Sequence, residues 1–264
     1  MRRVMIQLYQ FPFSHYCEKT RWALDYKGIP YRVVNLLPGV HRWTVGELAP
    51  ETCVPVLRDG EITVQDSTAI IDYLDTRYPN PSLTPDAPGT ARQALEWEEY
   101  LDEEVGVTLR LWFYYHCLPY RRLALRFLLK GAVWHKRLLF MLAYPRVRNL
   151  MIQRMSIDAS AASQSEARLR AALNKLDDAL DSRRFLVGDR FSRADLTACA
   201  LLSRCCLPDD REASAIFPAA LLNFRNELKG RRFYQWVRTV HETYRQRSAL
   251  SHGQAQGRRL ARAR

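Results

Sequence analysis

The sequence lacks several features that would place it in a specialised class of protein. Its 264 residues hold six cysteines, which show neither the density of a secreted disulfide scaffold nor the paired Cys-x-x-Cys spacing of a structural zinc site. No apolar run approaches the roughly 18 residues that a membrane-spanning helix requires. The N-terminal stretch, interrupted by Gln7, Gln10 and Pro12, is not typical of a signal peptide. We therefore expect a cytoplasmic protein with reduced thiols and no bound metal.

Acidic residues are scarce in one part of the chain only. The net charge is +12, and residues 1–89 hold 9 Lys and Arg against 10 Asp and Glu, whereas residues 90–264 hold 31 against 18. Val105 to Ile157 contains no acidic residue and ten Lys and Arg. Such a segment favours contact with something anionic, although solvated surface charge is the simpler interpretation.

The first eighty residues show the pattern of a small α/β domain. An apolar run, an amphipathic helix ending at Gly28 and a second run form a βαβ unit with parallel pairing. A hairpin around Asp59-Gly60 and another helix follow. The predicted elements are strands Val4–Tyr9, Tyr31–Leu36, Val54–Arg58 and Glu61–Val64, with helices His15–Lys27 and Asp66–Tyr78.

A proline-rich stretch separates this part from a helical remainder. Pro79 to Gly89 holds four prolines and a glycine in eleven residues, which no regular element tolerates. The predicted organisation is a domain at 1–80, a linker at 81–89, an all-helical domain at 90–250 with a basic insertion around 118–155, and a disordered basic tail at 251–264. Helices are expected near 90–117, 120–143, 146–182, 192–206, 214–228 and 231–246.

One predicted helix start carries a strong folding signal. Ser192 is a good N-cap, Asp195 can reach back to its amide, and Phe191 with Leu196 has the spacing of a hydrophobic staple. We assign these residues to folding rather than to catalysis.

Several stretches, in the same order along the chain, resemble motifs of the cytosolic glutathione transferase family. They are Phe13 to Cys17, Lys27 to Tyr31, Cys53 to Leu57, Gln65 to Ile70 and Phe191 to Asp195. The resemblance covers most of the chain and is closest to bacterial-like members with a serine- or cysteine-type active-site turn. It implies a thioredoxin-like βαβ–ββα domain followed by an all-α domain, glutathione as co-substrate, and a homodimer.

The resemblance places Ser14 where such members keep their catalytic residue. A thiol near pKa 8.5 must ionise to become a nucleophile. The amides and dipole at a helix N-terminus favour the thiolate, and the Ser14 hydroxyl can donate one more hydrogen bond to it. Two alternatives stay open: Cys17, since Ser14-x-x-Cys17 resembles a redox turn, and Tyr9, because other members use a tyrosine at the end of the first strand.

The resemblance also implies a glutathione site. A cis bond at Val54-Pro55 frees the Val54 backbone to pair with the tripeptide as an added strand would. Asp66 and Ser67 open a helix and suit the γ-glutamyl end, although they also form an ordinary helix cap. A weaker correspondence places a basic residue, His41 or Arg42, at the glycyl carboxylate.

The helical domain should supply the pocket for the electrophile. The aromatic stretch from Leu111 to His116 nominates Trp112, Tyr115 and, more weakly, His116. The basic insertion could instead bind an anionic electrophile, an acidic protein, or an anionic membrane surface with Trp134, Leu138, Leu139 and Phe140 inserted. No recognised nucleic-acid-binding fold is visible.

Three functions remain open from the sequence. The first is a transferase that activates glutathione for attack on a small hydrophobic electrophile. The second is a non-catalytic binding protein that uses the basic helical surface. The third is a glutathione-dependent thiol oxidoreductase that uses Cys17.

Overall fold

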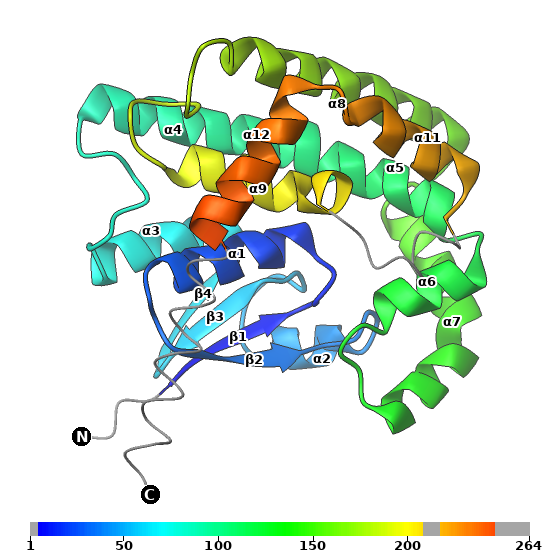
Figure 1. The fold of residues 1–264 in the computed structure, drawn as a ribbon. Coiled ribbons are helices and arrows are strands. Elements are labelled where there is room, and N and C mark those ends of the chain that lie inside the picture. The colour runs from blue at the N-terminus through cyan, green and yellow to red at the C-terminus, as the bar shows by residue number, and fades with distance from the viewer. Residues whose placement is uncertain (1–4, 208–216, 246–264) are drawn as a thin grey trace, which may run out of the picture.

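A computed structural model describes residues 5–207 and 217–245 (Figure 1). Its mixed sheet has the strand order β2-β1-β3-β4. β1 pairs in parallel with β2 and antiparallel with β3, and β3 pairs antiparallel with β4. The predicted βαβ–ββα arrangement, which is thioredoxin-like, is therefore confirmed. The strands are β1 Ile6–Gln10, β2 Tyr31–Asn35, β3 Val56–Asp59 and β4 Ile62–Gln65.

Three helices belong to the sheet domain, one more than predicted, and the rest form the predicted helical domain. α1 and α3 lie between the sheet and the helical domain (Figure 1). The helices of the sheet domain are α1 His15–Tyr26, α2 His41–Gly46 and α3 Ser67–Arg77; α2 was not anticipated from the sequence. The helical domain contains α4 Pro88–Leu101, η1 Asp102–Val107, α5 Thr108–Cys117, α6 Arg121–Leu128, α7 Trp134–Arg154, α8 Ala159–Ala179, α9 Arg193–Cys206, α11 Ala219–Leu228, α12 Arg232–Val240 and η2 His241–Arg245. The tail at 251–264 lies outside the described residues.

The predicted helix boundaries in the basic segment were wrong. The sequence suggested a break near Pro145, but α7 continues through this proline, and the breaks lie at residues 129–133 and 155–158. Pro145 cannot donate to the Met141 carbonyl, which accepts instead from Arg121 Nη2 at 3.1 Å. Gly131 makes the first break because it adopts a φ of +77°.

A buried set of charges joins the two domains. Lys19 of α1 lies 2.6 Å from both Glu98 of α4 and Asp102 of η1. Glu98 also binds Arg193 of α9, which in turn lies 2.6 Å from Asp72 of α3. Lys19, Glu98 and Arg193 have almost no exposed surface. Each of these charges therefore depends on its partners for compensation.

The predicted capping box at the start of α9 is confirmed. Asp195 Oδ2 accepts from the Ser192 N–H at 2.9 Å, and Asp195 Oδ1 accepts from the Leu186 N–H at 2.8 Å. Burial raises the pKa of Asp195 to about 6. Phe191 stacks on Trp22 of α1, with ring centroids 6.0 Å apart, so the cap also fixes α9 against the sheet domain.

Candidate active site

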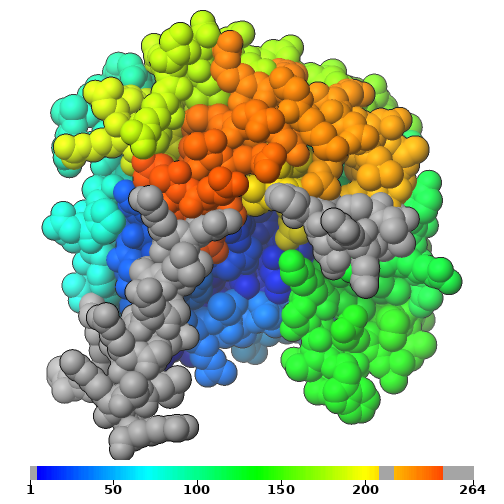
Figure 2. Space-filling view, viewed as in Figure 1, coloured from blue at the N-terminus to red at the C-terminus, as the bar shows by residue number. Residues whose placement is uncertain are grey.

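The main cavity lies between the sheet domain and the helical domain. Its volume is about 1270 Å³. The turn from β1 to α1 forms one side together with α2 and residues 52–54, and side chains of α5, α6, α7 and α9 form the other. In the space-filling view the surface is hollowed where the blue N-terminal segment faces the green α6 and α7 segment (Figure 2).

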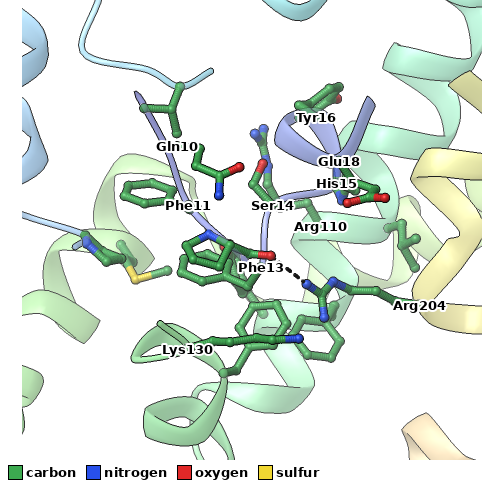
Figure 3. Close-up of a pocket in the computed structure, with 18 of the residues that line it drawn as sticks. Gln10, Phe11, Phe13, Ser14, His15, Tyr16, Glu18, Arg110, Lys130 and Arg204 are labelled. Atoms are coloured by element: carbon green, nitrogen blue, oxygen red, sulfur yellow. Dashed lines mark hydrogen bonds between the residues drawn. The ribbon is translucent and has the colours of Figure 1, made fainter. Parts of the chain in front are cut away.

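Ser14 lies at the lining of this cavity, at the N-terminus of α1. It is the N-cap residue, with extended backbone, and its Oγ accepts from the Cys17 N–H at 3.3 Å. Its side chain is partly exposed (Figure 3). A ligand atom in the cavity can thus meet both a hydroxyl and the positive end of α1.

The two alternative residues do not line the cavity. Cys17 is completely buried, and burial raises the pKa of its thiol more than the neighbouring Ser14 hydroxyl lowers it. Tyr9 directs its hydroxyl to Gln7 Oε1 at 2.9 Å. Neither side chain is therefore placed to meet a ligand in this cavity.

Cys53 and Val54 form part of the cavity wall near the Ser14 turn. The Val54–Pro55 bond is cis, and Val54 lines the cavity while Pro55 does not. Within residues 5–207 and 217–245 no hydrogen bond uses the Val54 N–H or C=O. Cys53 carries an exposed thiol at this wall, which the sequence analysis missed although Cys53 directly precedes the Val-Pro pair.

His41 and Arg42 also line the cavity, on α2. His41 Nε2 lies 3.0 Å from the Thr52 carbonyl oxygen, and its ring meets that of Phe11 edge-on with centroids 4.8 Å apart. Burial lowers the pKa of His41. The sequence analysis predicted no regular element for these two residues, whereas a short helix holds them beside residues 52–54.

Asp66 and Ser67 form a helix cap next to the cavity rather than part of its lining. Asp66 has a φ of 83°, and its Oδ1 accepts from the Thr68 N–H at 2.8 Å and the Ala69 N–H at 3.2 Å. The Asp66 N–H donates to the Pro55 carbonyl at 3.4 Å. Ser67 is only 1% exposed. The start of α3 therefore adjoins the cis-proline segment.

Of the three residues proposed for the electrophile pocket, only Trp112 lines the cavity. Trp112 Nε1 donates to Glu166 Oε2 at 3.0 Å, which fixes the indole ring. His116 lies one helical turn further on and meets the Trp112 ring edge-on, and neither His116 nor Tyr115 lines the cavity. The aromatic lining is completed by other residues, namely Phe11, Phe13, Tyr16, Phe113, Tyr114, Phe127, Phe217 and Phe224.

Arg110 also lines the cavity, although the sequence analysis counted it only among the ten Lys and Arg of the basic segment. Its guanidinium lies over the ring of Tyr16, 5.8 Å from the centroid. The Tyr16 hydroxyl donates to the Asp102 carbonyl at 2.7 Å. Gly106 lets Tyr16 approach this closely, since an added Cβ would lie 2.3 Å from the hydroxyl oxygen. Among the described residues no group of three or more His, Cys, Asp or Glu could hold a metal ion.

Both halves of the chain match one protein family. The model for the glutathione S-transferase N-terminal domain matches residues 8–82, and that for the C-terminal domain matches residues 136–220. The chain therefore belongs to the glutathione S-transferase family. It carries both of the family's domains in the expected order.

Known proteins agree with this assignment. The chain is 40% identical over 83 residues to glutathione S-transferase Z2 of Arabidopsis thaliana, covering 30% of this chain and 37% of the relative. It is 28% identical over 223 residues to glutathione S-transferase TCHQD of the same plant, covering 78% and 79%. The match thus spans less than two fifths of the length of the first relative.

A solved structure shows the same fold. A glutathione S-transferase from Methylobacterium radiotolerans, in complex with glutathione sulfonate, superimposes with a TM-score of 0.56 and 22% identity, covering 88% of this chain and 93% of that one. In the part of our chain that the structure describes, no helix combines the length and apolar character needed to cross a bilayer.

Proposed function

We propose that the protein is a glutathione transferase that holds the thiolate of glutathione at the start of α1 for attack on an electrophile. The observation that carries the proposal is the position of Ser14: it caps α1 and lines the cavity, whereas Cys17 is buried. The glutathione S-transferase names of the relatives support the same activity.

The proposed step is a nucleophilic substitution or addition. The thiol proton leaves to solvent, and the sulfur forms a bond to the electrophilic carbon. In a substitution the bond to the leaving group breaks, and a halide departs with the electron pair. In a conjugate addition the electron pair of the attacked double bond moves away from the sulfur and is then protonated from solvent. The α1 amides and the Ser14 hydroxyl favour the thiolate, because both present positive partial charge to the sulfur.

The tripeptide would lie along the wall formed by residues 52–54. The Val54 N–H and C=O, which no described group uses, can pair with its backbone as a neighbouring strand does. Arg42, beside His41, suits the glycyl carboxylate. The start of α3, at Asp66 and Ser67, suits the γ-glutamyl end, since the positive end of the helix dipole favours a carboxylate there.

We predict that glutathione raises the melting temperature of the protein. At about 100 times its dissociation constant a ligand stabilises the folded state by about 2.7 kcal/mol, which corresponds to roughly 5–10 °C for a protein of this size. The measurement is thermal unfolding with and without millimolar glutathione. Arg42→Gln should give a smaller shift, while Lys136→Gln, on the exposed side of α7, should match the wild type. The absence of any shift in the wild type would contradict a glutathione site.

The family resemblance further supports a cytoplasmic homodimer. A separate feature, the exposed face of α7, points to a second partner. Trp134, Leu138 and Leu142 follow one another at four-residue intervals and are 77%, 55% and 76% exposed. Leu139 is exposed too, but Phe140, which we expected on this surface, is buried. Lys136 and Arg137 are exposed on the same helix. We propose that this apolar face, flanked by cations, binds an anionic membrane surface.

Sedimentation with lipid vesicles tests this second proposal. The protein should bind vesicles that contain phosphatidylserine and should bind purely zwitterionic vesicles less. Leu138→Gln should weaken that binding, whereas Ile62→Gln, which also changes an exposed apolar residue, should leave it intact. If Leu138→Gln instead halves the solution mass, the face joins two copies of the chain and the membrane proposal is wrong.

A further inference from the structure

Arg110 lies where a π-helical turn, η1, ties the helical domain to the Ser14 turn. Such wide turns are frequent at functional sites. The Asp102 carbonyl at the start of η1 accepts from the Tyr16 hydroxyl at 2.7 Å, and Gly106 leaves room for that hydroxyl. Arg110 follows one helical turn after Gly106. Its guanidinium therefore lies over the Tyr16 ring, beside the Ser14 turn (Figure 3).

The Arg110 side chain has no anionic partner among the described residues. Within residues 5–207 and 217–245 it forms no hydrogen bond and no ion pair, and its Nε is buried without an acceptor. The contact that it does make is with the Tyr16 ring. Arg21, by contrast, pairs with Glu18 at 2.6 Å. A buried donor without an acceptor costs free energy, so a ligand that supplies an acceptor would be favoured here.

The charge of Arg110 acts on both sides of the proposed glutathione site. On one side burial, and next the charge of Arg110, lowers the pKa of His15 to about 3. On the other side burial raises the pKa of the Cys53 thiol, and the charge of Arg110 opposes this rise. His15 directly follows Ser14, and Cys53 directly precedes Val54. A ligand between the Ser14 turn and Val54 is thus exposed to the same charge.

Glutathione offers three anionic groups to such a guanidinium. Its two carboxylates are assigned above to Arg42 and to the start of α3. The third is the sulfur at Ser14, which lies two residues from the Tyr16 ring that Arg110 covers. A guanidinium stays charged throughout the neutral and mildly alkaline range, and it gives up water more readily than an ammonium group does. Arg110 therefore suits an anion in a partly enclosed cavity.

We propose that the Arg110 guanidinium contacts the sulfur of bound glutathione and, together with the Ser14 hydroxyl, holds it as the thiolate. The inference rests on the proposed transferase function and adds a catalytic residue from the helical domain. The thiol proton leaves to solvent, and the guanidinium offsets the negative charge that remains on the sulfur. An opposite charge within about 4–6 Å lowers the pKa of an acid by about 1–3 units.

The side chains around this position leave the sulfur free to titrate near neutral pH. Burial is the main cause of the lowered pKa values of the lining histidines, His15, His41 and His241. Burial also raises the pKa values of Tyr16 and Cys53 and brings that of Tyr114 to about 12. The other charged groups that act on His15 and Tyr16 are Arg204, Asp66, Asp102 and Glu103.

Titration of the bound sulfur tests the proposal directly, because a thiolate absorbs ultraviolet light that a thiol does not. The absorbance of the complex with S-methylglutathione, which has no ionisable thiol, is subtracted at each pH so that the protein's own tyrosines and thiols cancel. Arg110→Met should raise the pKa of the bound thiol by about one unit. Arg110→Lys should retain most of the lowering, and Lys136→Gln, outside the cavity, should match the wild type. An unchanged pKa in Arg110→Met would overturn the inference.

Calorimetry distinguishes contact with the thiolate from contact with a carboxylate. At mildly alkaline pH, Arg110→Met should weaken glutathione binding about fivefold and leave the affinity for S-methylglutathione within about twofold. Arg42→Gln should weaken both ligands alike, since both carry the glycyl carboxylate. Equal weakening of the two ligands by Arg110→Met would assign Arg110 to a carboxylate and overturn the inference alone. A wild type that binds neither ligand would instead contradict the proposed function itself.

Discussion

Ser14→Ala is expected to lower kcat/KM for conjugation of glutathione to 1-chloro-2,4-dinitrobenzene by about 10- to 100-fold at neutral pH, since a hydrogen bond to a charged group contributes roughly 1.5–3 kcal/mol. In the proposed mechanism the hydroxyl donates to the thiolate and so lowers the pKa of the bound thiol. Without it this pKa rises toward the usual 8.5 or so. The variant should therefore recover part of its activity as the pH is raised from 7 to 9, which loss of the α1 cap would not produce.

Cys17→Ala provides the comparison for this experiment. Because Cys17 is completely buried and lies outside the cavity, we expect its loss to leave kcat/KM within about threefold of the wild type. The main effect should be a lower unfolding free energy, as for other substitutions that shorten a buried side chain. Full activity of Ser14→Ala would contradict our assignment. Loss of activity in Cys17→Ala alone would favour the thiol oxidoreductase.

Glu98→Gln is expected to lower the free energy of unfolding by about 3–5 kcal/mol. Glu98 is the shared partner of Lys19 and Arg193, which are both buried. Removing its charge leaves the two cations without full compensation in the interface between the domains. Urea denaturation followed by tryptophan fluorescence measures the change, and Trp22 lies close to this interface.

Glu96→Gln in the same helix is the matched control. Glu96 forms an exposed pair with Arg92 at 3.6 Å, and such pairs contribute less than about 1 kcal/mol. The unfolding free energy of this variant should therefore stay close to that of the wild type. If Glu98→Gln is no more destabilised than Glu96→Gln, the buried network does not hold the domains together. If Glu98→Gln does not fold, Glu98→Leu with Lys19→Met and Arg193→Met tests whether removing the three most deeply buried charges of the set restores folding.

The fold was largely predictable from the sequence because its signals are local. Alternating apolar runs, the Asp59-Gly60 turn and the Ser192 to Asp195 cap each depend on residues a few positions apart. The predicted helix break at Pro145 was wrong because the helix there depends on a contact that is distant in the sequence. The carbonyl that Pro145 leaves without a partner is satisfied by Arg121, which comes from another helix.

The candidate site was predictable only in part. Ser14, Val54, His41 and Arg42 do line one cavity with Trp112, but Tyr9, Cys17, Pro55, Asp66, Ser67, Tyr115 and His116 do not. The sequence was enough to place Ser14 at the N-terminus of a helix, because a helix start depends on the residues next to it in the chain. It could not tell which face of α5 looks into the cavity, because the orientation of the helix is set by its packing against α8, α11 and α6.

The sequence by itself determined the domain order, the sheet topology, the family and the uneven charge, since each depends on local pattern or on composition. Tertiary structure decided that Cys17 is buried while Ser14 is accessible, and that residues of the basic segment line the same cavity as Ser14. Arg110, Lys130 and Arg204 are separated by up to 94 positions in the chain. Only the packing of α5, α9 and the turn after α6 around one cavity brings these three side chains into the same lining.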